Sequence, residues 1–250
     1  MFIKKNLNRI IYAVLGMPLS QSIWNALFGY YWRGWFLGII RYRAVYMVNS
    51  GETVILGGVF SESYVEDYSN RVGRNGKVIV VEANPVNILK LRDRFKSNKN
   101  ILFINRAIWS KEKKLTFLAA HQDKSQGYNR VKNENIDEFP NHLVQDVNEI
   151  SVSACTLDTI MQILNLDKVD QINLTINGAE LPALDGFKSI LRNNNKLRFY
   201  INSQHPEPST NVIWQLKDLG FRVFKSYLIN TTNKKIKLVR IYAFASGNLK

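Results

Sequence analysis

Chemistry-bearing residues follow three apolar runs of the sequence, at points where strands are predicted to end. Gly57 and Gly58 follow the first run, Glu82 ends the second, and Glu180 comes shortly after the third. Glycines allow a ligand to approach the backbone closely. A carboxylate at a strand end can accept two hydroxyl hydrogen bonds at once, which is how nucleotide-binding folds hold ribose. The residues therefore indicate a site for a ligand that contains a nucleoside.

Glu82 could also be an ordinary loop acid. The residues Ala83, Asn84 and Pro85 follow it directly and predict a tight turn from a strand into a helix. This context favours the functional interpretation. Glu180 is open to two interpretations as well, because a carboxylate in the first turn of a helix is explained by the helix dipole alone.

Two residues could remove a proton from a substrate. His205 lies just past a predicted strand, and the unperturbed histidine pKa of about 6.5 suits a base at neutral pH. Its structural alternative is a loop histidine held by the turn at Pro206. Glu180 is the second candidate base. The single cysteine, Cys155, excludes a disulfide framework, and the three histidines lack ligand spacing, so we predict no metal site.

The elements that must position these residues alternate between strands and helices. Strands are predicted over Thr53–Gly58, Gly76–Glu82, Asn100–Ile108, Ser151–Cys155, Val169–Ile176 and Leu197–Ser203, and Lys114–Ala119 could add another. Helices are predicted over Ser61–Arg74, Pro85–Asn98, Leu157–Leu164, Ala179–Asn193 and Thr210–Leu219. Phe221–Ile229 and Lys237–Ala245 should form a terminal β-hairpin. This order predicts an α/β fold with a mostly parallel sheet, whose ligands bind at the carboxyl ends of the strands.

The charge of the chain is distributed unevenly. Lys and Arg number 34 against 20 acidic residues, which gives a net charge of +14. Residues 1–46 contain no acidic side chain, and their aromatic residues include Trp24, Trp32 and Trp35. We interpret them as a helical segment that either caps the main domain or lies at a membrane interface. A true span is disfavoured because Pro18 and several polar residues interrupt the uncharged run.

The remaining chain, residues 47–250, is expected to form one domain, with the polar stretch 121–149 as an insertion or lid-like loop. Its Lys and Arg residues are dispersed and no nucleic-acid motif is present, so we do not expect a nucleic-acid partner. We expect a cytoplasmic protein that can contact a membrane peripherally through residues 1–46.

From about residue 51 to residue 225, the order of the motifs resembles the FkbM family of S-adenosylmethionine-dependent methyltransferases. The matching elements are Gly57-Gly58, Val81-Glu82-Ala83-Asn84-Pro85, Asn100-Ile101 through Ala107, Thr156-Leu157-Asp158, Gly178-Ala179-Glu180-Leu181, His205-Pro206 and Gly220-Phe221-Arg222-Val223. The resemblance implies a class I methyltransferase-like (Rossmann-like) sheet. It also implies that Gly57, Gly58, Glu82 and Ala83 contact S-adenosylmethionine, with Glu82 on the ribose.

The implied reaction is O-methylation of a hydroxyl on a sugar, glycan or lipid-linked acceptor, with His205 and Glu180 as catalytic candidates. The sequence departs from the family pattern where Ile55, Thr175 and Ser203 replace acidic residues. A degenerate relative that acts as a binding or scaffold module is therefore the alternative. A nicotinamide-dependent oxidoreductase is disfavoured, because the glycine fingerprint G-x-G-x-x-G is absent.

Overall fold

The computed structural model describes residues 47–59, 61–120, 129–132, 147–187, 194, 196–203, 206–229 and 236–245. The expected N-terminal helical segment, residues 1–46, lies outside the described residues. So does His205.

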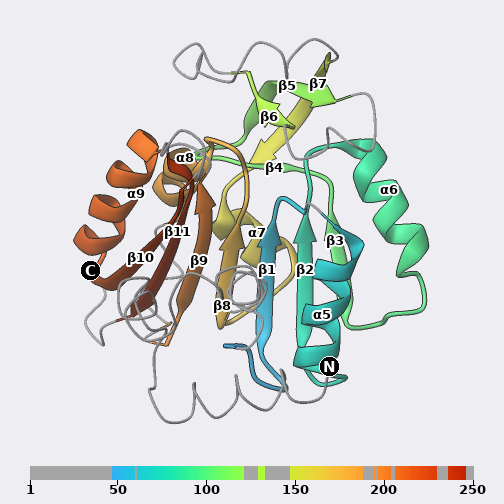
Figure 1. Ribbon diagram of the computed structural model, residues 1–250. Helices are drawn as coiled ribbons and strands as arrows, with labels where there is room; N and C mark the ends of the chain where they lie inside the picture. The colour runs from blue at the N-terminus through green and yellow to red at the C-terminus, as the bar shows by residue number, and fades with distance from the viewer. Residues whose placement is uncertain are drawn as a thin grey trace.

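The main sheet has seven strands in the order β10-β11-β9-β8-β1-β2-β3 (Figure 1). Their bounds are β1 Thr53–Gly57, β2 Lys77–Val81, β3 Ile101–Ile104, β8 Gln171–Leu174, β9 Arg198–Ser203, β10 Phe221–Ile229 and β11 Ile236–Ala245. Neighbours pair in parallel except around β11, which is antiparallel to both β9 and β10. The predicted class I methyltransferase-like sheet, mostly parallel and ending in an antiparallel hairpin, is confirmed.

The chain order reverses between β1 and β8. From β1 the sheet continues through β2 and β3 in one direction, and from β8 through β9 and the hairpin in the other. Such a switch point opens a crevice at the carboxyl ends of the two central strands, where ligands of open α/β sheets bind. The site is therefore expected above β1 and β8.

Five described helices cover the two faces of this sheet, and their apolar residues make two clusters. Helices α7 (Leu157–Ile163), α8 (Glu180–Asp185) and α9 (Pro206–Asp218) contribute to one cluster. Helices α5 (Glu62–Val72) and α6 (Pro85–Arg94) contribute to the other. Because β1 and β2 are buried on both faces, their residues are apolar without alternation, as their continuous apolar runs predicted.

A second sheet of four strands, in the order β4-β7-β5-β6, is a feature that the sequence analysis did not predict as a unit. Its strands are β4 Ala107–Ile108, β5 Lys113–Ala120, β6 Arg130–Val131 and β7 Val147–Cys155. In Figure 1 it lies beyond the end of the main sheet at which α6 begins. Strand β7 begins four residues before the predicted Ser151, and β6 falls inside the stretch that was expected to be a loop.

The predicted strand Asn100–Ile108 is interrupted, and this correction has a local cause. The side-chain amide of Asn105 donates to the backbone carbonyls of Glu82 at 2.8 Å and of Ala83 at 3.1 Å. Asn105 thus turns away from the sheet to hold the end of β2. The chain resumes as β4, which pairs with β7 in the second sheet.

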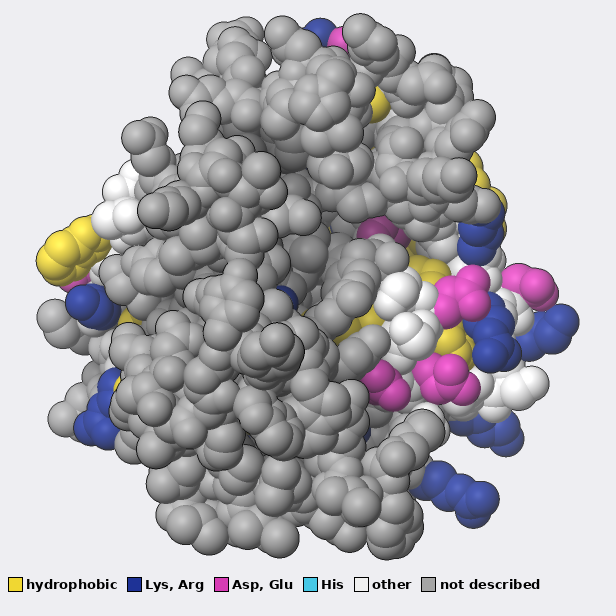
Figure 2. Space-filling model, viewed as in Figure 1, with side chains coloured by type: hydrophobic (Ala, Val, Ile, Leu, Met, Phe, Trp, Pro, Cys, Tyr) yellow, Lys and Arg dark blue, Asp and Glu magenta, His cyan; other side chains and the backbone are white. Residues whose placement is uncertain are grey.

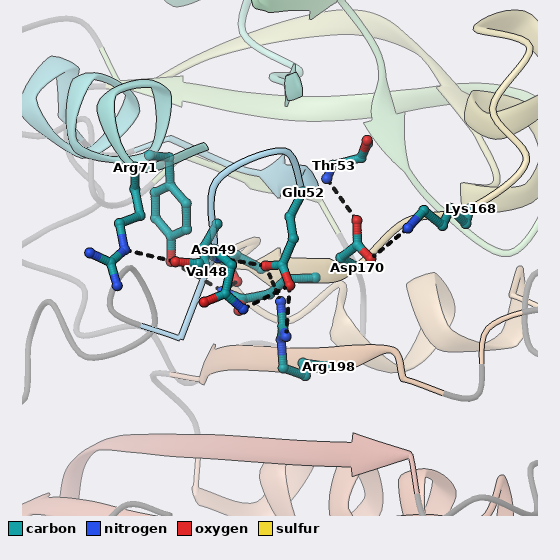
Figure 3. A network of polar contacts seen from close by, with 11 residues as sticks. Val48, Asn49, Glu52, Thr53, Arg71, Lys168, Asp170 and Arg198 are labelled. Atoms are coloured by element: carbon teal, nitrogen blue, oxygen red, sulfur yellow. Dashed lines mark hydrogen bonds and ion pairs between the residues drawn. The ribbon is translucent and has the colours of Figure 1, made fainter. Parts of the chain in front are cut away.

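Polar contacts fasten the opposite, amino-terminal edge of the main sheet (Figure 3). The guanidinium of Arg198, at the start of β9, donates two hydrogen bonds to the carboxylate of Glu52, just before β1. Both side chains are more than four-fifths buried. The backbone N–H of Thr53 donates to Asp170 at 2.8 Å. Burial acts to raise the pKa of Glu52, but the hydrogen bonds and charge of Arg198 and the contacts of Asn49 outweigh it and lower the pKa.

Replacing Glu52 by glutamine should destabilise the protein by about 1–3 kcal/mol, because Arg198 would stay buried without its counterion. Because the pKa of Glu52 is lowered in the folded state, its contribution is full above the unfolded pKa of about 4.3 and is lost as the pH falls through the folded value. Urea unfolding at neutral pH and at low pH measures both effects. Glu62→Gln is the matched control, since Glu62 pairs with Arg94 at 3.5 Å with both side chains half exposed. Its cost should stay below about 1 kcal/mol. Equal losses in the two variants would contradict this assignment.

The net positive charge does not gather over α5 and α6. Figure 2 shows acidic and basic side chains interspersed on this part of the surface. Exposed residues there include Glu62, Glu66, Arg92, Asp93 and Arg94. Mixed signs of this kind cancel the field that a polyanion would need. Among the described residues, no helix reaches the length and hydrophobicity of a membrane span.

Candidate active site

The end of β1 approaches β8 so closely that only glycine fits. A Cβ on Gly58 would lie 2.2 Å from the backbone oxygen of Thr175, and Gly58 has a φ of +73°. A Cβ on Gly57 would meet the side-chain ends of Ile108 at 2.5 Å and Leu174 at 2.9 Å. Protein atoms thus fill the positions that side chains at these two residues would occupy, while the predicted contact of both glycines with a ligand stays a prediction. The glycines allow the two central strands to meet at the switch point.

Replacing Gly58 by alanine should lower the free energy of unfolding by about 2–4 kcal/mol. About 1–2 kcal/mol comes from the left-handed conformation, and the rest comes from the clash with a backbone atom that cannot move aside. Gly51→Ala is the matched control, because Gly51 has a φ of +86° and open space around its Cβ position. Gly51→Ala should therefore lower the free energy of unfolding only by the cost of the left-handed conformation, about 1–2 kcal/mol. Chemical denaturation of both variants measures the difference, and equal losses would contradict the close approach at Gly58.

Glu82 joins the loops that follow β1 and β2 at the carboxyl edge of the sheet. Its carboxylate accepts the backbone N–H of Val59, after β1, at 3.2 Å and that of Asn84, after β2, at 2.8 Å. The residue is only 5% exposed. Burial raises the pKa of Glu82, while the backbone N–H groups of Asn84, Val59 and Ala83 oppose the rise. Among the described residues, Val59 and Asn84 make the hydrogen bonds to this carboxylate, one to each oxygen, so each oxygen keeps a second lone pair for a further donor.

The turn that holds Glu82 is fixed from several sides. The side-chain oxygen of Asn84 accepts the N–H of Val86 at 2.9 Å and caps α6, in which Pro85 occupies the first turn as predicted. Ala83 packs against the apolar cluster of the second sheet. Its carbonyl also accepts the amide of Asn105. The predicted tight turn is therefore present and rigid.

Glu180 lies on the loop between β8 and α8, at the same edge of the sheet. Its side chain is completely buried, and one carboxylate oxygen accepts the N–H of Gly178 at 2.9 Å. The other oxygen has no hydrogen-bond partner among the described residues. Burial raises the pKa of Glu180 to about 7, against the hydrogen bonds of the surrounding backbone. A carboxyl group with this pKa can give up and take back a proton near neutral pH.

The loop that carries Glu180 contacts the second sheet. Asn177 and Gly178 both have positive φ, +47° and +97°, as the dipeptide Asn-Gly favours in a turn. The side-chain amide of Asn177 donates to the backbone oxygen of Asn129 at 2.8 Å. The next residue, Arg130, begins β6 and is buried, and burial lowers its pKa. Part of the expected insertion therefore lies directly against the β8 loop.

A network of buried amides and tyrosines occupies the sheet face under α5. The amide of Gln171 donates to Asn173 at 2.9 Å, and the amide of Asn173 donates to the hydroxyl of Tyr64 on α5 at 3.0 Å. The network gives the buried side chain of Asn173 a donor and an acceptor partner. Ile55, where the resemblance places an acid, is fully buried in the apolar cluster on the other face.

The structure brings Gly57, Gly58, Glu82 and Ala83 together at the switch point, with Glu180 on the neighbouring β8 loop. His205 lies outside the described residues, so its position relative to Glu180 stays a prediction. Sequence reasoning missed Asn105 and the contact between Asn177 and Asn129. Asn105 follows a strand as a lone polar residue, which is a weak signal. The pairing of Asn177 with the insertion spans 48 positions and has no local signal at all.

Three solved structures to which the chain is similar are methyltransferases by their descriptions. One is precorrin-6y C5,15-methyltransferase from Geobacter metallireducens GS-15, with 16% identity over 83% of this chain and 88% of that chain and a TM-score of 0.45. The rRNA methylase of Streptococcus thermophilus shares 11% identity over 82% and 94%, with a TM-score of 0.47. Aeropyrum pernix fibrillarin, solved with natively bound S-adenosyl-L-methionine, shares 11% identity over 81% and 74%, also with a TM-score of 0.47. A search of curated proteins gives no match.

The family comparison is more specific. The model of the methyltransferase FkbM domain matches residues 47–223, which include both central strands, the Glu82 turn and the Glu180 loop. The match covers well over half of the chain. The chain therefore belongs to the FkbM methyltransferase family, and its methyl donor is S-adenosylmethionine.

Proposed function

We propose that this protein transfers the methyl group of S-adenosylmethionine to a hydroxyl oxygen of a sugar, glycan or lipid-linked acceptor. The observation that carries the proposal is the position of Glu82. Its carboxylate is held by backbone donors from the loops after β1 and β2 and keeps one lone pair on each oxygen. Two free acceptor sites side by side fit the two adjacent hydroxyls of a ribose.

When bound, the sulfonium supplies an activated methyl group and a neutral leaving group. The residues of this chain then need only to orient the two reactants and accept a proton. Glu82 orients the donor through its ribose. The acceptor oxygen forms the new bond to carbon as the carbon–sulfur bond breaks, and its proton goes to a base. Glu180 is the base that we assign, because it combines a pKa of about 7 with an unpartnered oxygen. His205 is the second candidate.

A lipid-linked acceptor is supported by the composition of residues 1–46. Their aromatic and basic side chains, without any acid, are typical of segments that lie at a membrane surface. We expect the full-length protein to sediment with anionic phospholipid vesicles and not with neutral ones. Equal recovery from both kinds of vesicle would remove this support and leave soluble sugars and glycans as acceptors.

The alternative function is a binding or scaffold module that keeps the fold without turnover. Ile55 favours it, since the fully buried apolar side chain leaves no carboxylate at that position. Incubation with radiolabelled S-adenosylmethionine and separated lipid-linked, glycan and small-sugar fractions of a cell extract discriminates the two. We expect label in one fraction with the wild type and none with Glu82→Ala. Absence of label from all fractions, with the donor bound, would overturn the enzymatic proposal in favour of the module.

A further inference from the structure

Arg240 on β11 is a buried cation for which the described residues provide no counterion. The residue is 8% exposed, and its Nε has no hydrogen-bond partner in the part of the chain that the structure describes. Among the described residues, no ion pair includes Arg240. Residues 1–46 contain no acid that could serve as one. Burying a charge without a partner costs several kcal/mol, so Arg240 lowers the stability of the fold unless a ligand pairs with it.

The register of the sheet places Arg240 at the carboxyl edge, in line with the crevice. Arg240 pairs with Asn202 of β9, one residue beyond the pair of Ile201 with Leu174 of β8. Leu174 in turn pairs with Gly57 of β1. One row across the sheet therefore runs from Gly58 through Thr175 and Asn202 to Arg240. Neighbouring strands lie about 4.8 Å apart, so Arg240 is about 14 Å from the end of β1, on the side away from Glu82.

The polar neighbour of Arg240 on the same sheet face also offers a donor. The side-chain oxygen of Asn202 already accepts the hydroxyl of Tyr200 at 3.0 Å. What remains for a ligand is its amide N–H₂ group. A guanidinium and an amide donor, adjacent across two strands, match the oxygens of a phosphate or a carboxylate.

We propose that Arg240 and Asn202 bind an oxyanion group, a phosphate or a carboxylate, on the acceptor molecule. The inference rests on the proposed methyl transfer and names the class of acceptor: a hydroxyl compound that carries an anionic group. Arg240 lies beyond residue 223, where the family match ends. Arg240 also lies on the side of β1 away from Glu82, so we assign the contact to the acceptor and not to the methyl donor.

Thermal unfolding with inorganic phosphate or acetate, at constant ionic strength set with NaCl, tests the inference. At several times the dissociation constant of the anion, the melting temperature of the wild type should rise by about 2–4 °C. Arg240→Met should abolish the rise and, without added anion, should melt at the same temperature as the wild type or higher. The matched control is Arg222→Met, which removes an exposed arginine from the neighbouring strand β10. It should keep the full rise.

An equal rise in Arg240→Met and the wild type, or no rise with either anion, would overturn the inference. A marked loss of stability in Arg240→Met without added anion would do the same, because it would show a structural partner. Measuring the binding of S-adenosylhomocysteine to the same samples distinguishes a failure of the anion-site inference from a failure of the proposed methyltransferase function. The wild type and Arg240→Met should bind it equally. If the wild type does not bind it, the methyltransferase proposal fails whatever the anions do.

Discussion

Replacing Glu82 by alanine should weaken the binding of S-adenosylhomocysteine by about 10²–10⁴-fold. The carboxylate offers one free lone pair on each oxygen, and hydrogen bonds to a charged group contribute about 1.5–3 kcal/mol each. Two such bonds to the ribose correspond to this range of affinity. Isothermal titration calorimetry measures the dissociation constant of both proteins.

The variant also loses the acceptor for the N–H groups of Val59 and Asn84, so its folding has to be checked by circular dichroism and thermal unfolding. Glu66→Ala is the matched control: it removes an exposed carboxylate from α5 and should bind like the wild type. A folded Glu82→Ala protein that binds S-adenosylhomocysteine within about threefold of the wild type would show that Glu82 does not hold the ribose.

Replacing Glu180 by glutamine should lower kcat by about 10²–10⁴-fold, the range that a general base contributes. In the wild type, kcat should fall as the pH drops below about 7, because Glu180 then becomes protonated. The variant should lose this dependence along with its rate. An unchanged acidic limb of the pH–rate profile in Glu180→Gln would exclude Glu180 as the base and leave His205.

The same substitution should raise stability at alkaline pH. The pKa of Glu180 is about 7 in the folded state, against about 4.3 in the unfolded chain. Between these values only the folded state holds the proton, so wild-type stability falls as the pH rises through this window. The difference corresponds to about 4 kcal/mol, present in full well above pH 7. Glutamine keeps an acceptor for Gly178 and carries no charge. Urea unfolding of Glu180→Gln should therefore show a gain at pH 8.5 and almost none at pH 4.5.

The sequence was informative about the main sheet because each of its strands has a local signal. These signals are local, because each involves only a few neighbouring positions of the sequence. They are the buried apolar runs of β1, β2 and β8, the Pro85 turn and the hairpin residues. In the second sheet, β5 and β7 were predicted from local patterns, but nothing indicated that β4 and β6 are separate strands or that the four strands pair. Strand β6 is two residues long and lies inside a polar stretch. The break between β3 and β4 depends on a hydrogen bond from the side chain of Asn105 to the distant turn at Glu82.

For the site, the residue types at strand ends predicted where the candidate site lies. They did not predict the packing around the glycines, the pKa of Glu180 or the surroundings of Arg240. The glycines at 57 and 58 were predicted to let a ligand approach, and the structure gives them a second role, because Cβ atoms there would meet Leu174, Thr175 and Ile108. The raised pKa of Glu180 depends on complete burial, and the isolation of Arg240 depends on which side chains fail to reach it. Both properties come from the assembled structure and cannot be read from spacing.

A crystal structure of the protein with S-adenosylhomocysteine, at a concentration that saturates the wild type, tests the central claim most directly. The account predicts ribose hydroxyls within hydrogen-bond distance of both carboxylate oxygens of Glu82, above the ends of β1 and β8. Ligand density elsewhere on the molecule, or in the crevice with its ribose turned away from Glu82, would contradict it.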